Sequence, residues 1–458
     1  MVGCATVPHV GPTNSAGRGT QIEVSGSRGT LSERDTKAIL ARLAATAPDA
    51  GALERHLAIE QAVAESTLYA DNRVTILQNG DETFPAMFAA IRGAQHYIYL
   101  EYYIFEDVTS QGTKLSDLLL AKRQAGVEVD LIYDAVGSIS TSADFIASLQ
   151  SAGIRVVQFN PLNPLKSKAH YSVNDRDHRK ILITDGQLVI LGGINLSSTY
   201  ESGPGSGTSK HATDTIKRDG AQQNAAEPRE LWRDIDVEIS GPVVVDLEKL
   251  FKEHWSEQHG APIADQAAVR QAGPHGQEVV RIIGSSPSRV TSRYYVTVLA
   301  AVRNAEQKAW ITAAYFVPTR QEQAALIRAA RRGVDVRLLL PSHSDSSPAL
   351  AIQHSHYSEL LKAGIKIYES DDVILHSKTM VVDTVWSVTG SSNFDHRSIL
   401  FNDEVDAIII GKSTGDQLES IFQSDVQHAH QIDLVTWRKR SLGERLRERF
   451  WPIWEKMF

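Results

Sequence analysis

The sequence has almost no cysteine and no long apolar run. A single cysteine, Cys4, stands among 458 residues, so an internal disulfide is impossible and a disulfide-stabilised scaffold is excluded. No run of eighteen apolar residues occurs, so the sequence predicts no transmembrane helix. Positive charge is not in excess, because the formal net charge is −8, and this disfavours a protein that coats nucleic acid. The chain is long enough for two domains with separate cores.

Helical and extended patterns alternate along most of the chain, and the alternation occurs twice. The predicted helices and strands lie between residues 84 and 157 in the first pass and between 295 and 368 in the second. Short fragments match between the passes, for example GVEV at 126–129 and GVDV at 333–336. Nearly continuous apolar runs that follow a glycine are typical of buried strands after helices. The sequence therefore predicts a duplicated α/β unit of about 190 residues.

The limits of the repeat divide the chain into four parts. Residues 1–71 are predicted to form a flexible leader followed by helices, the first capped by Ser32. The two copies are expected at 72–260 and 261–435. Residues 436–458 form a tail with a net charge of +4 and three tryptophans. Its amphipathic pattern is typical of contact with anionic lipid, and packing on the protein's own surface is the alternative.

One motif, H-x-K-x-x-x-x-D, appears once in each copy and carries the chemistry. After six further residues each motif is followed by a pair of small residues and an Asn. The motif residues are His178, Lys180, Asp185 and Asn195 in the first copy, and His376, Lys378, Asp383 and Asn393 in the second. A single copy would be weak support for a catalytic site, whereas two copies in register are strong support.

The apolar residues around each motif predict that it lies on a strand. Residues two apart on a strand point the same way, so His178 and Lys180 share a face. Asp185 has the opposite parity and precedes a glycine, as in a hairpin turn. The two motif aspartates are therefore expected to hold turns rather than to take part in chemistry. The returning strand brings Asn195 close to the histidine and the lysine.

The combination of two imidazoles, two ammonium groups and two amides suits the oxygens of a phosphate group. A zinc site is disfavoured, because a lysine beside each histidine would oppose a cation. Two imidazoles allow double displacement, in which one histidine holds the phosphoryl group covalently and the other transfers protons. Two carboxylates, Asp234 and Glu404, begin matching strands after each Asn and are placed to orient the histidines.

An insertion makes the copies unequal. Asn393 and Glu404 are eleven residues apart, whereas Asn195 and Asp234 are thirty-nine apart. The difference is the polar, Gly-rich segment 202–228. A disordered surface loop is the favoured interpretation of this segment, and a mobile cover over the active site is the alternative.

These motifs resemble the twin H-K-D motifs of the phospholipase D superfamily, and the chain is most similar to its bacterial cardiolipin synthases. The similarity covers about residues 72–435 and includes the stretches LEYYIF (100–105), YDAVGS (133–138), GGIN (192–195), LWRD (231–234) and GSSNFDHRS (390–398). The resemblance implies two phospholipase-D-like α/β sandwich domains, packed with pseudo-two-fold symmetry around one shared active site. It implies no metal and no cofactor. The site residues that follow are His178, Lys180, Asp185, His376, Lys378 and Asp383 as the candidate catalytic set, Asn195 and Asn393 for substrate binding, and Asp234 and Glu404 for orienting the histidines.

The resemblance also implies a reaction. A phosphatidyl group would pass from phosphatidylglycerol, or another phospholipid donor, to a second phosphatidylglycerol, with His178 as nucleophile and His376 as acid and base. A phospholipase D that makes phosphatidic acid with water as acceptor is one alternative, and an inactive protein that binds lipid or phosphate is another. A nuclease is disfavoured by the acidic chain and by the lack of a basic, aromatic track.

The start of the sequence bears on location. Met1-Val2-Gly3-Cys4 resembles the end of a bacterial lipoprotein signal without its hydrophobic region. A lipid anchor on Cys4, in a protein with a truncated start, and a free N-terminal thiol are both open. Either way, the expected location is the bacterial membrane, by an anchor or by peripheral contact through the tail 436–458.

Overall fold

The computed structural model describes residues 10, 22–63, 66–163, 172, 174–201, 231–264, 275–287, 292–344 and 346–440. We call 66–264 the first half and 275–440 the second half. The segment 202–228, the tail beyond residue 440 and Cys4 lie outside the described residues. Within them, no helix is both long and apolar enough to cross a membrane.

Each half is built on a seven-stranded mixed sheet, and the strand order is the same in both. In the first half the order is β8-β7-β4-β10-β11-β13-β3, and in the second it is β17-β16-β15-β19-β20-β21-β14. The first set comprises β3 (Leu68–Gln78), β4 (Tyr97–Tyr102), β7 (Glu128–Asp134), β8 (Arg155–Phe159), β10 (Lys180–Thr184), β11 (Leu188–Gly192) and β13 (Ile235–Ser240). The second comprises β14 (Glu278–Ser285), β15 (Lys308–Ala313), β16 (Asp335–Pro341), β17 (Lys366–Ser370), β19 (Lys378–Val382), β20 (Trp386–Gly390) and β21 (Asn402–Ile410). The predicted duplication is confirmed.

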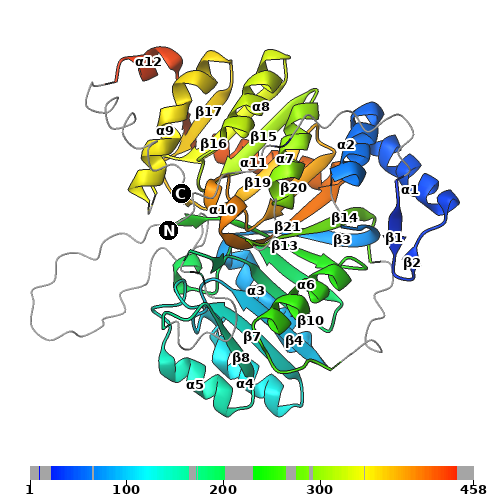
Figure 1. Cartoon of the computed structure of the whole chain (residues 1–458), viewed down its shortest axis with the longest axis vertical. Coiled ribbons are helices and arrows are strands. Elements are labelled where there is room, and N and C mark those ends of the chain that lie inside the picture. Colours follow the sequence, from blue (N-terminus) through cyan, green and yellow to red (C-terminus); the bar gives the residue numbers. More distant parts are fainter. Residues whose placement is uncertain are drawn as a thin grey trace, which may run out of the picture.

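The two sheets meet edge to edge in the middle of the molecule (Figure 1). There β3 and β14 pair antiparallel, with an irregularity in the register between Glu278 and Val280. A buried apolar cluster spans the seam, since it contains Val237 and Ile239 of the first half together with Val280 and Ile409 of the second. Each half has its own core, and a third apolar cluster joins the halves at the seam in place of a polar interface.

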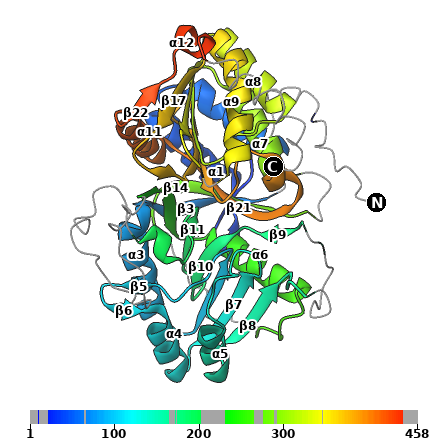
Figure 2. The same cartoon turned by 90° about the vertical axis from the view of Figure 1, so that its left-hand side faces the viewer.

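Helices cover both faces of the sheets, as the alternating sequence pattern predicts (Figures 1 and 2). They are α3 (Asn79–Gly93), α4 (Leu115–Gln124), α5 (Ala143–Ser151) and α6 (Val244–Glu257) in the first half, and α7 (Arg293–Asn304), α8 (Arg320–Arg331), α9 (Ser347–Lys362), α10 (His396–Leu400) and α11 (Lys412–Val426) in the second. Gly126, Gly153, Gly333 and Gly364 follow four of them with positive φ, where residues other than glycine are strained. The glycines that follow the predicted helices in the sequence are thus helix-ending residues.

Two further short strand pairs connect the halves near the motifs. The strand β9 (Arg176–Asp177) pairs parallel with the start of β21. The strand β12 (Trp232–Arg233) pairs parallel with β18 (Ile374–Leu375). A motif histidine directly follows one strand of each pair: His178 follows β9, and His376 follows β18. These short pairings thus bring residues 226 and 142 positions apart into contact.

The N-terminal helices are α1 (Glu33–Thr46) and α2 (Ala50–Val63), and the predicted cap is confirmed, because the Ser32 side chain accepts from the backbone N–H of Asp35. The helix α2 docks on the second half through charge. Glu60, which is buried, accepts hydrogen bonds from the Arg281 guanidinium and from the Trp386 indole. The short strands β1 (Val24–Gly26) and β2 (Gly29–Thr30) were not predicted from the sequence.

The described part of the C-terminal tail packs on the protein. The helix α12 (Leu434–Arg438) places Trp437 against Tyr357, with ring centroids 4.8 Å apart, and Arg440 stacks over the indole. Trp437 is 7% exposed and belongs to the core of the second half. At Trp437 the alternative of packing on the protein's own surface therefore holds, because Tyr357 and its neighbours bury its apolar surface.

Candidate active site

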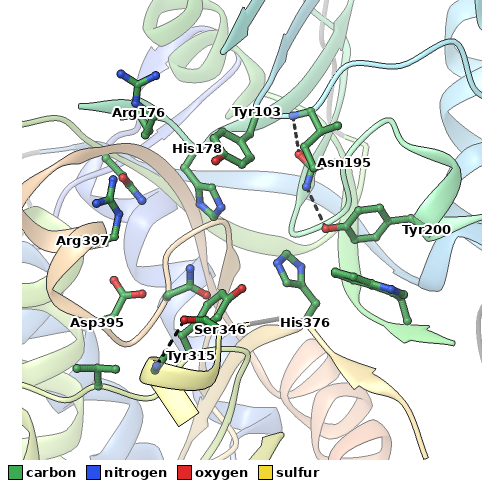
Figure 3. A pocket seen from close by; sticks show the side chains of 16 residues that line it. Tyr103, Arg176, His178, Asn195, Tyr200, Tyr315, Ser346, His376, Asp395 and Arg397 are labelled. Carbon is green, nitrogen blue, oxygen red and sulfur yellow. Dashed lines mark hydrogen bonds between the residues drawn. The ribbon is translucent and has the colours of Figure 1, made fainter. Parts of the chain in front are cut away.

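Both motif histidines line one pocket of about 300 Å³ at the junction of the halves. Figure 3 shows His178 and His376 opposite each other across it. The lining residues are Tyr103, Ile104, Arg176, His178, Asn195, Tyr200 and Trp232 from the first half, and Tyr315, Val317, Ser346, Ala349, His376, Asn393, Asp395, Arg397 and Asn402 from the second. The two motifs thus contribute to a single site.

The backbone of each histidine is bonded to the opposite half. The N–H of His178 donates to the carbonyl of Asp403 at 2.9 Å, and the N–H of His376 donates to the carbonyl of Arg233 at 2.8 Å. These bonds continue the short parallel pairings β9–β21 and β12–β18. The separation of the two imidazoles is therefore determined by sheet pairing rather than by loops.

The side-chain partners cross between the halves as well. Nδ1 of His178 lies 3.0 Å from Oε2 of Glu404, and Nδ1 of His376 lies 2.7 Å from Oδ2 of Asp234. Both carboxylates are almost fully buried. A carboxylate on Nδ1 holds the proton there and leaves Nε2 for the reaction. The sequence indicated that these carboxylates would orient imidazoles, but it did not indicate that each would orient the histidine of the other copy.

The small residues before each Asn make room for these carboxylates. A Cβ on Gly193 would collide with the carboxylate of Asp234. In the second copy Ser391 donates to Glu404 at 2.5 Å, and Ser398 donates to the same carboxylate at 2.8 Å. The motif's small-residue pair therefore serves the orienting carboxylate.

Burial lowers the pKa of both imidazoles. The pKa of His376 falls to about 4, because burial and the neighbouring Lys378 outweigh the attraction of Asp234. Burial also lowers the pKa of His178, with Glu404 opposing the shift. Burial alone would raise the pKa of Glu404, but His178 and Lys180 together lower it. At neutral pH both histidines are therefore neutral, and both can act as nucleophiles or bases.

The motif lysines lie beneath the histidines and do not line the pocket. Lys180 is 1% exposed, and its Nζ donates to the carbonyl of His178 at 2.6 Å. Burial lowers its pKa to about 7. Lys378 contacts the carbonyl of His376 and lies 3.0 Å from its Nδ1. We expected the two lysine ammonium groups to face the pocket. Instead, both lie behind the histidines and contact the carbonyls of those histidines.

The motif aspartates hold turns, as their parity on the strand predicts. Asp185 has a φ of 53° and accepts three backbone N–H bonds, from Gln95, His96 and Tyr97. Asp383 has a φ of 51° and accepts the N–H groups of residues 306–308 and a contact from His56 of α2 at 3.2 Å. Neither carboxylate lines the pocket. Their place in the candidate catalytic set is therefore corrected: they are positioning residues.

Replacing either aspartate by alanine is expected to lower the stability of the fold more than it lowers the rate of the reaction. Three N–H groups lose their acceptor in each case, so Asp185→Ala and Asp383→Ala should each lower the free energy of unfolding by about 2–4 kcal/mol. Urea unfolding followed by tryptophan fluorescence would measure this. His56→Ala is a comparison variant: it removes the contact to Asp383 that Asp185 has no counterpart for, together with the packing of a buried imidazole, and it leaves the three N–H bonds of Asp383 in place. A large loss of kcat with unchanged unfolding would contradict the positioning role.

The two motif asparagines differ in their surroundings. Asn195 accepts from the N–H of Ile104 at 3.1 Å and donates to the hydroxyl of Tyr200 at 3.0 Å (Figure 3). Both ends of its amide are thus engaged in the pocket wall. Oδ1 of Asn393 has no hydrogen-bond partner among the described residues. Both residues were expected to bind substrate. Among the described contacts, only Asn393 keeps an amide oxygen without a hydrogen-bond partner.

Several lining residues were not assigned roles from the sequence. Aromatic rings surround His376, with the centroids of Trp232, Tyr200 and Tyr315 lying 5.3, 5.7 and 6.5 Å away. Tyr103 lies 5.2 Å from His178. Two arginines, described below, supply the positive charge of the pocket. Arg176 could have been found, because it stands two residues before His178 and so shares its face.

A buried ion network lies behind His178. Arg179 pairs with Glu101 at 3.0 Å and with Asp403 at 3.2 Å, while His254 contacts Glu101 at 2.8 Å. Glu101, His254 and Asp177 are the one group with ligand-like spacing among the described residues. The guanidinium of Arg179 already supplies positive charge to this group. The group does not line the pocket. Through Arg179, which follows His178 in the chain, it holds this part of the backbone in place.

The comparisons with known proteins agree on one family. A family model described as "Cardiolipin synthase, PLD-like domain" matches residues 87–202 and 298–426. The chain is 32% identical over 391 residues to cardiolipin synthase 1 of Bacillus cereus, a match that covers 83% of this chain and 72% of that protein. It is 33% identical over 380 residues to cardiolipin synthase of Geobacillus thermodenitrificans, covering 82% and 70%. The fold is similar to the crystal structure of phosphatidylserine synthase from Haemophilus influenzae, with a TM-score of 0.63, 13% identity, and coverage of 87% and 98%.

Proposed function

This chain belongs to the phospholipase-D-like cardiolipin synthase family and is a phospholipid transphosphatidylase, and from that premise we propose that it makes cardiolipin through a covalent phosphohistidine. The donor is phosphatidylglycerol and the acceptor is a second phosphatidylglycerol. The observation that carries the proposal is the pair of opposed imidazoles, each held at Nδ1 by a buried carboxylate. One phosphorus between two Nε2 atoms is the geometry that double displacement needs.

In the first step Nε2 of His178 attacks the phosphorus of the donor. The N–P bond forms while the bond from phosphorus to the glycerol oxygen breaks. The protonated Nε2 of His376 gives its proton to that oxygen, and glycerol leaves. The negative phosphodiester raises the pKa of His376 from about 4, because opposite charge favours the imidazolium.

In the second step a hydroxyl of the acceptor replaces glycerol. Its proton passes to Nε2 of His376, its oxygen attacks the phosphorus, and the N–P bond breaks. Cardiolipin leaves, and both histidines return to their starting states. Lys378, and Lys180 in its protonated form, contribute positive charge behind the imidazoles, which stabilises the charge that builds up on the oxygens of the transferred group.

Product analysis tests the proposal. Phosphatidylglycerol labelled in its acyl chains is supplied in mixed micelles, and the lipid products are separated. Cardiolipin with an equimolar amount of glycerol supports the transfer. Phosphatidic acid as the sole labelled product would show that water is the acceptor and would overturn it. Binding of phosphatidylglycerol without any product would indicate a lipid-binding protein instead.

We propose that the reaction takes place at a membrane surface, which the enzyme reaches by peripheral contact. The support is the lipid substrate together with the net charge of +4 in residues 436–458. Basic residues near anionic lipid contribute about 1 kcal/mol each. Sedimentation with phosphatidylglycerol vesicles, compared with neutral phosphatidylcholine vesicles, measures this contact, and equal binding to both would contradict an electrostatic one.

A further inference from the structure

Two arginines line the same pocket as the histidines and come from opposite halves. Arg176 lies on β9, and Arg397 lies on α10. Figure 3 shows both on one side of His178, while Asn195 and Tyr200 lie on the other side of the pocket. The positive charge of the pocket wall is therefore displaced to one end instead of being spread around the histidines.

The reacting phosphate has a different place. In-line displacement requires its phosphorus between Nε2 of His178 and Nε2 of His376. The motif lysines stand behind the two histidines, where each contacts the carbonyl of its own histidine. The two guanidinium groups lie to the side of the line joining the imidazoles (Figure 3). Their charge therefore suits an anionic group next to the reacting phosphate.

The arginines are held in place by the backbone of one segment. Nη2 of Arg397 donates to the carbonyl of Asn174 at 3.0 Å, and Nη2 of Arg176 lies 3.4 Å from the carbonyl of Ser172. Arg397 also stacks on the ring of Phe401, with the guanidinium carbon 5.9 Å from the ring centroid. A planar guanidinium that is fixed in this way is preorganised for bidentate contact with a phosphate.

The nearest carboxylates are committed elsewhere. Oδ1 of Asp134 accepts the N–H groups of Val136 and Gly137 at 2.8 and 2.9 Å, and it lies 3.4 Å from Nη1 of Arg176. Asp395 caps α10 by accepting from Ser398 at 2.8 Å, and burial raises its pKa to about 6. The charge of Arg397 opposes the rise in the pKa of Asp395, but no ion pair joins the two side chains among the described contacts, so an anionic ligand can still contact the guanidinium.

We infer that Arg176 and Arg397 form a second anion subsite that binds the phosphodiester of the acceptor lipid. The inference rests on the proposed function and goes further, because it names the residues that select the acceptor. The acceptor is a hydroxyl-bearing lipid that carries its own phosphate, and not a simple alcohol or water. Binding at this subsite places the acceptor hydroxyl next to the phosphohistidine, where His376 takes its proton.

A competition in one tube tests the subsite. Acyl-labelled phosphatidylglycerol serves as donor in mixed micelles, and ethanol is present as an acceptor without a phosphate. Each enzyme then partitions its phosphohistidine between cardiolipin and phosphatidylethanol. Arg397→Gln and Arg176→Gln should each lower the ratio of cardiolipin to phosphatidylethanol at least ten-fold, since one charge-assisted contact is lost. Arg397→Lys should lower it less, because it keeps the charge but not the planar fork.

The controls separate this inference from the proposed function. Arg331→Gln, an exposed change at the end of α8, should keep the ratio of the unmodified enzyme. If Arg397→Gln does not fold, Arg397→Lys carries the test with at least a three-fold drop. An equal loss of both products would assign the arginines to the reacting phosphate and overturn the inference. Phosphatidylethanol without cardiolipin from the unmodified enzyme would instead overturn the proposed function.

Discussion

Replacing His178 by alanine is expected to abolish phosphatidyl transfer, with a loss of at least about 10⁴-fold in kcat. In the proposed mechanism this imidazole supplies the atom that forms the covalent bond, and the described lining residues include no other histidine on that side of the pocket. Rapid acid-free quenching of the enzyme with labelled phosphatidylglycerol should trap label on the unmodified protein and none on His178→Ala.

His376→Ala is the matched variant and should fail differently. Its loss with phosphatidylglycerol should be comparable, because no acid protonates the leaving glycerol. A donor with a nitrophenolate leaving group needs no such acid, so His376→Ala should release one equivalent of nitrophenol and keep the label. If His178→Ala gives this burst and His376→Ala does not, the two roles are reversed. If both variants turn over normally, the site is wrong.

Replacing Glu404 by glutamine, or Asp234 by asparagine, is expected to lower kcat by about 10²- to 10⁴-fold. Each amide keeps the shape of the carboxylate but does not stabilise the charged imidazole or select its tautomer. The crossing predicts which histidine each change disables. Glu404→Gln should reproduce the loss of the nucleophile, although Glu404 lies in the second motif's half. Asp234→Asn should reproduce the loss of the acid, and the nitrophenyl donor should restore its burst.

Double variants check the crossing independently. Because residues that act as a unit are not additive, Glu404→Gln should add little to His178→Ala, and Asp234→Asn should add little to His376→Ala. Asp416→Asn, an exposed change on α11, serves as the control for carboxylate loss. The opposite pairing of non-additive changes would show that each carboxylate serves its own copy.

Local sequence patterns predict most of the fold and part of the site. The Ser32 cap, the glycines after the helices and the strands of both passes depend on neighbouring residues, so they can be read directly. Asp185 and Asp383 could be assigned to turns by parity alone. The lysines could not be placed, because a shared strand face does not say whether a side chain reaches the pocket or folds back to its neighbour's carbonyl.

Contacts between distant parts of the chain could not be predicted from the sequence. Glu404 reaches His178 across 226 positions through β9 and β21, and the sequence has no signal for that pairing. Trp437 stands next to basic residues, as in a helix that lies on a membrane surface, yet it packs on Tyr357. The periodicity of a helix shows which face is apolar but not what that face packs against. Arg176 could have been assigned to the pocket from the sequence by the argument already used for the lysines, because residues two apart on a strand point the same way.

The crossed carboxylates have a consequence for how the two copies can evolve. After a duplication, one copy is usually free to lose residues while the other keeps the function. Here Glu404 contacts the histidine of the first copy, and Asp234 contacts that of the second. We therefore expect that neither copy can lose its carboxylate without harming the other copy's histidine. The difference in length between the copies lies between Asn195 and Asp234, away from both contacts.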